Sequence, residues 1–211
     1  MAWVSLVAFT MRRFRCAAFG RFGEKLLRWP GEQRLLNVRT YVKVGEESAI
    51  CFLAEWQSSW INAQLGPHLY SLPYRWGRLK YRRATGDIRW GAVEDRCQTA
   101  GGGFHYEVEA EGPTIRAPKG STTEFLLERY VAFNKCGDAN KSRSFRIQHS
   151  PWEVRSARVH HFGDELFRQT LPWWSNAQFV SADISEGAKN VGMSAPDVGS
   201  KGSVIDGMYS F

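Results

Sequence analysis

Residues 36–42 read LNVRTYV, and the pattern of this stretch decides the fold class. In an extended chain the polar residues Asn37, Arg39 and Tyr41 fall on one face, and the residues between them fall on the other. A period of two is typical of a β-strand with one face in a core. The stretch therefore predicts a strand that lines a pocket with a polar row.

Short strands are predicted along most of the chain. Alternating or continuous apolar runs predict strands over residues 3–9, 36–42, 49–56, 75–83, 88–94, 104–111 and 144–149. Short helices are expected within residues 60–72, where Gly66-Pro67 should interrupt the helix, after the capping box at Ser121, and over residues 165–170. Many strands with few short helices predict a mainly β (α+β) fold.

The composition suits one globular domain. The chain has 211 residues, of which 43% are hydrophobic and 14% aromatic, enough to build a core. After residue 180 glycine, serine, alanine and aspartate become frequent, and such a segment buries too little apolar surface to offset its ordering entropy. We expect one domain over residues 1–184 and a flexible C-terminal tail over residues 185–211.

The net charge and the spacing of the cysteines limit which partners and cofactors the sequence predicts. The formal charge of +7 could attract nucleic acid, but no recognised nucleic-acid-binding motif accompanies the arginines. The four cysteines are scattered without metal-ligand or redox spacing, so we expect free thiols in the cytoplasm, no metal and no cofactor. The apolar residues 1–10 are too short to span a bilayer, and we expect no membrane association.

Five ordered blocks carry a family resemblance. The blocks read LNVRTYV, FLAEW, LGPHLYSLPYRWGRLKYRR, FLLERYVAF and IQHSPWEV, and over residues 2–180 the chain resembles the YqjF-like domain-of-unknown-function family of bacteria. That family is related to acetoacetate decarboxylase. The resemblance implies a cone-shaped antiparallel β-barrel with a few short helices around a central cavity.

The beginning of the chain departs from the family pattern. Family members usually start with a further strand and a helix rich in proline and leucine, before the block that matches residues 3–7. The resemblance therefore predicts an N-terminally truncated barrel. An open barrel edge would favour a homodimer.

Arg39 and Glu55 are the centre of the candidate site. The fixed charge and planar donor fork of an arginine suit a carboxylate or phosphate ligand. An isolated buried charge is costly, so an inward arginine needs an acid or an anionic ligand. Two interpretations stay open from the sequence: a structural pair of Arg39 with Glu55, or an anion site.

Tyr74 and Arg75 resemble, by position, the paired lysines of acetoacetate decarboxylase, the first of which forms a Schiff base with a keto acid. Tyrosine has no amine and arginine is too basic to act as a nucleophile, so imine chemistry cannot run at these positions. The two side chains could still hold an anion. Tyr41 and His149 complete the candidate pocket, although His149 also suits a hydrogen-bonded core position.

Two other polar groups have ordinary structural explanations. Glu128, Arg129 and Tyr130 form a second polar group in the family pattern, and we assign it mainly a structural role. His160 and His161 are adjacent, so on a strand they face opposite sides and cannot bind one metal together.

Three functions remain open from the sequence. The first is a barrel that binds a small organic acid or another anion, with any catalysis by acid–base rather than imine chemistry. The second is a non-catalytic structural or protein-interaction domain. The third is nucleic-acid binding through the arginine-rich surface.

Overall fold

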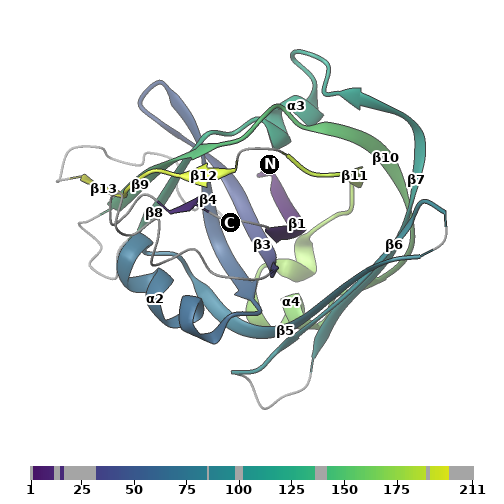
Figure 1. Cartoon of the computed structure of the whole chain (residues 1–211), viewed down its shortest axis with the longest axis horizontal. Coiled ribbons are helices and arrows are strands. Elements are labelled where there is room, and N and C mark those ends of the chain that lie inside the picture. Colours follow the sequence, from purple (N-terminus) through teal and green to yellow (C-terminus); the bar gives the residue numbers. More distant parts are fainter. Residues whose placement is uncertain are drawn as a thin grey trace.

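The structure is a computed structural model, and it describes residues 2–11, 15–16, 32–84, 86–97, 102–135, 142–188 and 191–199. The strands, coloured along the sequence from purple to yellow in Figure 1, are β1 (Val4–Met11), β2 (Arg15–Cys16), β3 (Gln33–Val44), β4 (Glu47–Gln57), β5 (Tyr74–Arg83), β6 (Ile88–Asp95), β7 (Gly103–Arg116), β8 (Val131–Lys135), β9 (Ser142–Gln148), β10 (Glu153–Gly163), β11 (Asp183–Ser185), β12 (Gly192–Met193) and β13 (Asp197–Gly199). The helices are α2 (Trp60–Tyr70), α3 (Thr122–Leu127), α4 (Glu165–Thr170) and the 3-10 helix η2 (Trp174–Asn176).

One mixed sheet contains these strands. Its main order is β11-β10-β7-β6-β5-β4-β8-β9-β12-β2, with β3 joining β1 to β4 and β13 pairing with β9. The sheet curves strongly, and α4 lies inside the curve (Figure 1). Among the described residues the two ends of the main path do not pair, so the sheet is not closed. The mainly β fold with few short helices is confirmed.

The predicted sheet was antiparallel throughout, and the structure differs at β4. This strand runs parallel to β5, with Glu55 opposite Tyr74, and parallel to β8, with Ile50 opposite Ala132. Helix α2 connects β4 to β5 and carries the chain back along the sheet, which is the connection that parallel neighbours require. Hairpin-like pairings, such as β5 with β6, are antiparallel as expected.

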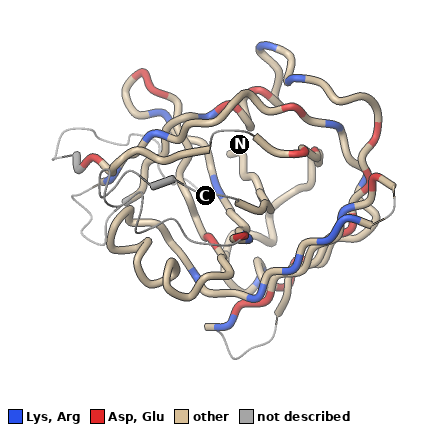
Figure 2. Tube along the Cα trace, in the orientation of Figure 1, with Lys and Arg blue, Asp and Glu red and all other residues tan. Residues whose placement is uncertain are grey.

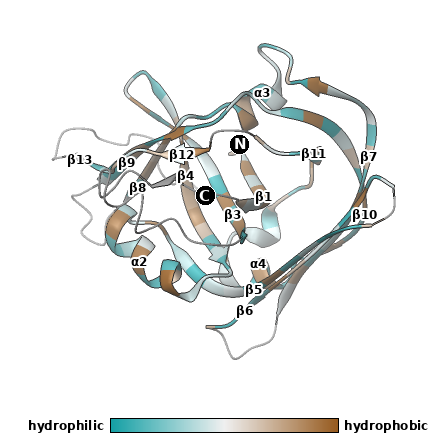
Figure 3. Ribbon diagram, in the orientation of Figure 1, coloured by the Kyte–Doolittle hydropathy of each residue, from teal (hydrophilic) through white to brown (hydrophobic). Residues whose placement is uncertain are grey.

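Strands β3 and β4 form the central pair. Most of the register is regular, but it shifts between Val38 and Arg39, because Val38 lies opposite Ala54 and Arg39 lies opposite Phe52. Leu53 is thus the extra residue of a β-bulge. Bands of apolar and polar residues alternate along β3 (Figure 3). The bulge keeps Phe52 on the same face as Glu55, which simple alternation would not do.

The main core lies on the apolar face of β3 and β4. Leu36 and Val38 pack there with Trp56, and α4 supplies Leu166 and Phe167 from the other side. The Phe167 ring lies 6.0 Å from the Trp56 ring and 4.7 Å from the rings of both Phe104 and Trp174. The predicted split between an apolar and a polar face of β3 is therefore present in the structure.

Helix α2 is continuous, although the sequence predicted an interruption at Gly66-Pro67. The side chain of Ser59 accepts the N–H of Asn62 at the helix start, and Pro67 sits in the last turns, where it removes only one helical hydrogen bond. Gly66 is required for packing. A Cβ on this residue would come within 2.0 Å of the Tyr74 ring.

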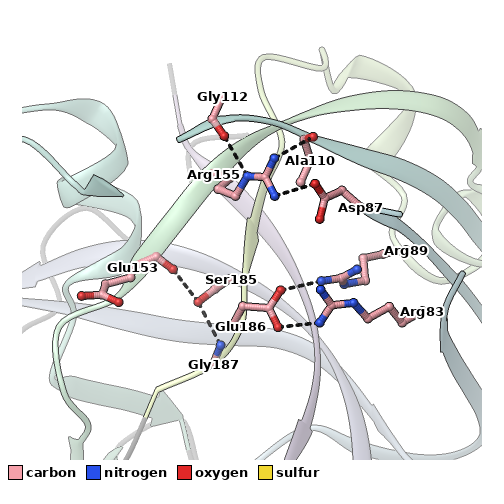
Figure 4. A network of polar contacts seen from close by, with 10 residues as sticks. All are labelled: Arg83, Asp87, Arg89, Ala110, Gly112, Glu153, Arg155, Ser185, Glu186 and Gly187. Carbon is pink, nitrogen blue, oxygen red and sulfur yellow. Dashed lines mark hydrogen bonds and ion pairs between the residues drawn. The ribbon is translucent and has the colours of Figure 1, made fainter. Parts of the chain in front are cut away.

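Part of the segment that was expected to be a flexible tail is paired in the structure. β11 pairs with β10, and the Glu186 carboxylate accepts Arg83 Nη1 at 2.9 Å and Arg89 Nη2 at 2.6 Å (Figure 4). Nearby, Arg155 contacts Asp87 at 2.8 Å. β12 and β13 pair with β9. Residues 200–211 lie outside the described residues, and the domain boundary at 184 stays a prediction.

Replacing Phe167 should test the core directly. Phe167→Ala removes a fully buried ring and should lower the free energy of unfolding by about 3–5 kcal/mol. Phe179→Ala is the matched control, because Phe179 is 66% exposed and its loss should change stability by less than about 0.5 kcal/mol. Guanidinium denaturation measures both. Equal effects of the two substitutions would contradict this description of the core.

Candidate functional site

The polar row of β3 faces away from the main core. Asn37 lies opposite Glu55, and Arg39 follows on the same face after the bulge. A second apolar cluster borders this face, with Tyr41, Phe52 and Tyr74 at its edge. The site therefore combines polar groups from two adjacent strands with an apolar surround.

Several buried polar atoms on this face have no hydrogen-bond partner among the described residues. They are Asn37 Oδ1, Arg39 Nε, Glu55 Oε2 and Gln57 Nε2. Buried polar groups in native proteins are nearly always bonded, and each orphan costs about 1–3 kcal/mol. Four such atoms on one side of the β3–β4 pair mark this face as a place where polar atoms from elsewhere can bind.

Glu55 is the most deeply buried acid of the site. Only 3% of the surface of Glu55 is exposed to solvent. Burial raises the pKa of this carboxyl well above its ordinary value of 4.5, and the Arg39 charge opposes the shift only in part. Among the described residues Arg39 and Glu55 form no ion pair. The alternative of a structural salt bridge between them is thus not what the structure contains, and the raised pKa favours the protonated form of Glu55.

Arg39 is held by the end of α3. Its Nη2 donates to the Leu126 carbonyl at 2.8 Å, and the Tyr41 hydroxyl donates to the same oxygen at 2.9 Å. Ser5 Oγ lies 2.6 Å from that hydroxyl. The guanidinium carbon is 6.0 Å from the centre of the Tyr41 ring. One side of the guanidinium is thus fixed, while Nε stays without a partner among the described residues.

A second arginine, Arg129, is also anchored at the end of α3. The Arg129 guanidinium stacks 4.4 Å above the Phe125 ring, and Phe125 in turn lies 4.9 Å from Tyr41. Arg129 Nη1 donates to the carbonyl of Glu128 at 2.8 Å. Burial lowers the pKa of Arg129 and Arg39 lowers it further, while Tyr41 and Glu124 act in the opposite direction. Sequence reasoning gave Arg129 a structural role, because nothing in its local pattern points toward Arg39.

Tyr74 and Arg75 separate in the structure. Tyr74 is in register with Glu55, whereas Arg75 is in register with Trp56 and points to the opposite face. There Arg75 Nη1 lies 3.4 Å from Asp95, which also accepts the Trp56 indole N–H at 2.9 Å. Arg75 is therefore not beside Glu55. Alternation along β5 was the sequence signal for this separation, since neighbours on a strand face opposite sides.

His149 belongs to a separate aromatic cluster. Its ring stacks on Tyr130 at 4.7 Å and lies 5.3 Å from Trp152, and Nδ1 is 2.8 Å from the Ser150 carbonyl. Glu128 ties the cluster together by accepting the Trp152 N–H at 2.8 Å and the Tyr130 hydroxyl. This arrangement matches the expectation of a hydrogen-bonded histidine.

The described surface also has a groove away from Arg39. It has a volume of about 300 Å³ and is lined by Ser58, Trp76, Gly77, Arg78, Leu79 and Arg96. Lysine and arginine gather along β5 and β6 (Figure 2), and Arg78, Lys80 and Arg82 share an exposed face of β5. Part of the positive charge is balanced, as in the pairing of Arg83 and Arg89 with Glu186.

Within the part of the chain that the structure describes, no group of three or more His, Cys, Asp or Glu side chains could hold a metal ion. The described helices include none with the length and apolar character needed to cross a membrane.

Comparison with known proteins gives the family. The model of DUF2071, described as "Uncharacterized conserved protein (COG2071)", matches residues 1–181. The chain belongs to this family. No curated protein matches the chain in sequence. The family resemblance predicted from the five sequence blocks is confirmed.

Solved structures place the DUF2071 chain among proteins of known fold. It is similar to the enduracididine biosynthesis enzyme MppR complexed with pyruvate, with a TM-score of 0.50 and 11% identity over 81% of this chain and 71% of that chain. An MppR structure with HEPES buffer bound has a TM-score of 0.46 and 13% identity, covering 70% of this chain and 60% of that chain. The first similarity confirms the predicted acetoacetate decarboxylase-like fold.

The buried Glu55 should make stability depend on pH. A carboxyl whose pKa is raised by folding is ionised first in the unfolded chain, so the wild-type protein loses stability as pH rises above 4.5. Glu55→Gln removes this dependence. We expect the stability of Glu55→Gln relative to wild type to increase between pH 4 and pH 7, as measured by urea denaturation at each pH. A relative stability that falls over this range would contradict a raised pKa.

Proposed function

We propose that this DUF2071 protein binds a small organic acid or similar anion at Arg39. The observation that carries the proposal is a partly buried guanidinium that forms no ion pair with a described residue and retains an unbonded Nε. A buried cation without a counter-charge is costly, and an anionic ligand removes that cost. The orphaned atoms of Asn37 and Glu55 supply further polar contacts.

The chemistry of the site suits a carboxylate. Arg39 would bind its oxygens through Nε, a charge-assisted contact of about 1.5–3 kcal/mol. A protonated Glu55, which its raised pKa favours, would donate a hydrogen bond to a second oxygen of the ligand, and an ionised carboxylate could not do this. In a reaction, the same proton makes Glu55 a general acid.

The fold supports the same ligand class. MppR, which shares the fold, has been solved with pyruvate, a small carboxylic acid. In this chain the positions that resemble the Schiff-base lysines hold Tyr74 and Arg75, and Arg75 is paired with Asp95. We therefore propose non-covalent binding, with any reaction proceeding by proton transfer.

Two further properties belong to the proposal. The protein acts in the cytoplasm, which agrees with the free thiol of Cys97. It forms a homodimer, for which the support is strand β1: among the described residues this strand pairs only with β3 and leaves its other edge open. Size-exclusion chromatography with light scattering measures the second property.

A thermal-melt screen tests the binding proposal. Small carboxylates and phosphate should raise the melting temperature, because a ligand that binds the folded state stabilises it. At a concentration of about 100 times Kd the gain is about 2.7 kcal/mol. Arg39→Gln should abolish the shift.

Arg116→Gln is the charge-matched control, since Arg116 is exposed on β7 and should not contribute to binding. A cooperative melt that no anion shifts would favour the structural-domain alternative. A shift that persists in Arg39→Gln would place the anion elsewhere.

A further inference from the structure

Arg39 comes from β3 and Arg129 follows α3, and both side chains are anchored on carbonyls at the end of α3. Arg39 lies beside the Tyr41 ring, Arg129 lies over the Phe125 ring, and these two rings contact each other at a tilt of 40°. The charge of Arg39 acts on Arg129, so the two guanidinium groups are within electrostatic reach of each other. Two cations held together in a partly buried place repel each other and lose hydration, which disfavours this arrangement unless negative charge is nearby.

The acids around the two arginines supply only part of that charge, because Glu124 acts on Arg129 and Arg39 acts on Glu55 without a direct ion pair. Neither arginine is in an ion pair with a described residue. Glu124 accepts the Gly120 N–H at 2.5 Å, and Glu128 accepts Tyr130 and Trp152. Glu55 is buried and protonated more readily than an ordinary glutamate, as described above.

Main-chain carbonyls hold both side chains instead. Leu126 accepts from Arg39 and Glu128 accepts from Arg129, so each guanidinium is anchored at the end of α3. These carbonyls carry partial negative charge only. On each arginine the Nε atom is buried and has no described partner. These hydrogen bonds fix the orientation of both guanidinium groups before any ligand binds. Each guanidinium keeps its Nε–H as a free donor for another acceptor.

We propose that Arg39 and Arg129 together form a site for a small dianion, carrying either two carboxylates or a phosphate group. This inference rests on the proposed function and makes it specific, because one arginine would serve a monoanion. Guanidinium groups that are already oriented bind the paired oxygens of a carboxylate, or the oxygens of a phosphate, in preference to neutral groups. Arg129 would then set the preference for two charges, and Arg39 would bind either kind of anion.

Isothermal titration calorimetry with matched anions tests this. Malonate, succinate and phosphate are compared with acetate and propionate at constant ionic strength. The wild-type protein should bind at least one dianion about ten- to a hundred-fold more tightly than the monoanions, the range of one charge-assisted contact. Arg129→Gln should remove this preference, because it should weaken dianion binding more than monoanion binding. The dianion that shows the effect identifies dicarboxylate or phosphate as the source of the charge.

Control variants separate the possible failures. Arg129→Lys keeps the charge and should retain most of the preference, while Arg116→Gln should retain all of it. If the preference survives Arg129→Gln, or if wild type binds monoanions equally well, the dianion inference is overturned and the anion site at Arg39 stands. If the wild-type protein binds none of these anions, both the inference and the proposed function fail.

Discussion

The pairing of β3 with β4 is the constraint on which both the core and the site depend. β3 is hydrogen-bonded on both sides, to β1 and to β4, so its two faces are fixed. One face gives Leu36 and Val38 to the main core, which α4 covers. The other face must then hold Asn37 and Arg39, because the side-chain period of a strand leaves no other place for them. Core formation therefore determines where the polar row lies.

The β-bulge at Leu53 changes which β4 side chains share the polar face with Asn37 and Arg39. It moves Phe52 opposite Arg39 and keeps it on the face that Glu55 shares. The polar row is consequently framed by apolar side chains, and its atoms are buried. In these apolar surroundings a polar atom without a hydrogen-bond partner destabilises the fold. A new hydrogen bond to such an atom stabilises the protein more than the same bond would in water. Burial disfavours the ionised form of Glu55, and an anion that binds beside Arg39 must gain enough from the guanidinium to offset the same loss of hydration.

Much of the architecture could be predicted from the sequence, because local alternation fixes strands and capping residues fix helix starts. The strand at residues 36–42 and the helix after Ser121 both appear where local patterns predict them. The parallel neighbours of β4 could not be read from the sequence, since pairing between distant strands leaves no local pattern. The face of Arg75 could be predicted from alternation, but the family block that contains it suggested the wrong side. Arg129 reaches the site only because α3 ends beside β3, which is a tertiary contact.

The central claim is that the unbonded Nε atoms of Arg39 and Arg129 bind a ligand anion. The most direct measurement is nitrogen-15 NMR of the arginine Nε–H groups during titration with malonate or phosphate, with signals assigned from the Arg39→Gln and Arg129→Gln variants. We expect the two signals to shift together and to saturate at one ligand concentration, because both donors gain the same acceptor. Two signals that stay unchanged up to millimolar anion, while the protein remains folded, would contradict the account.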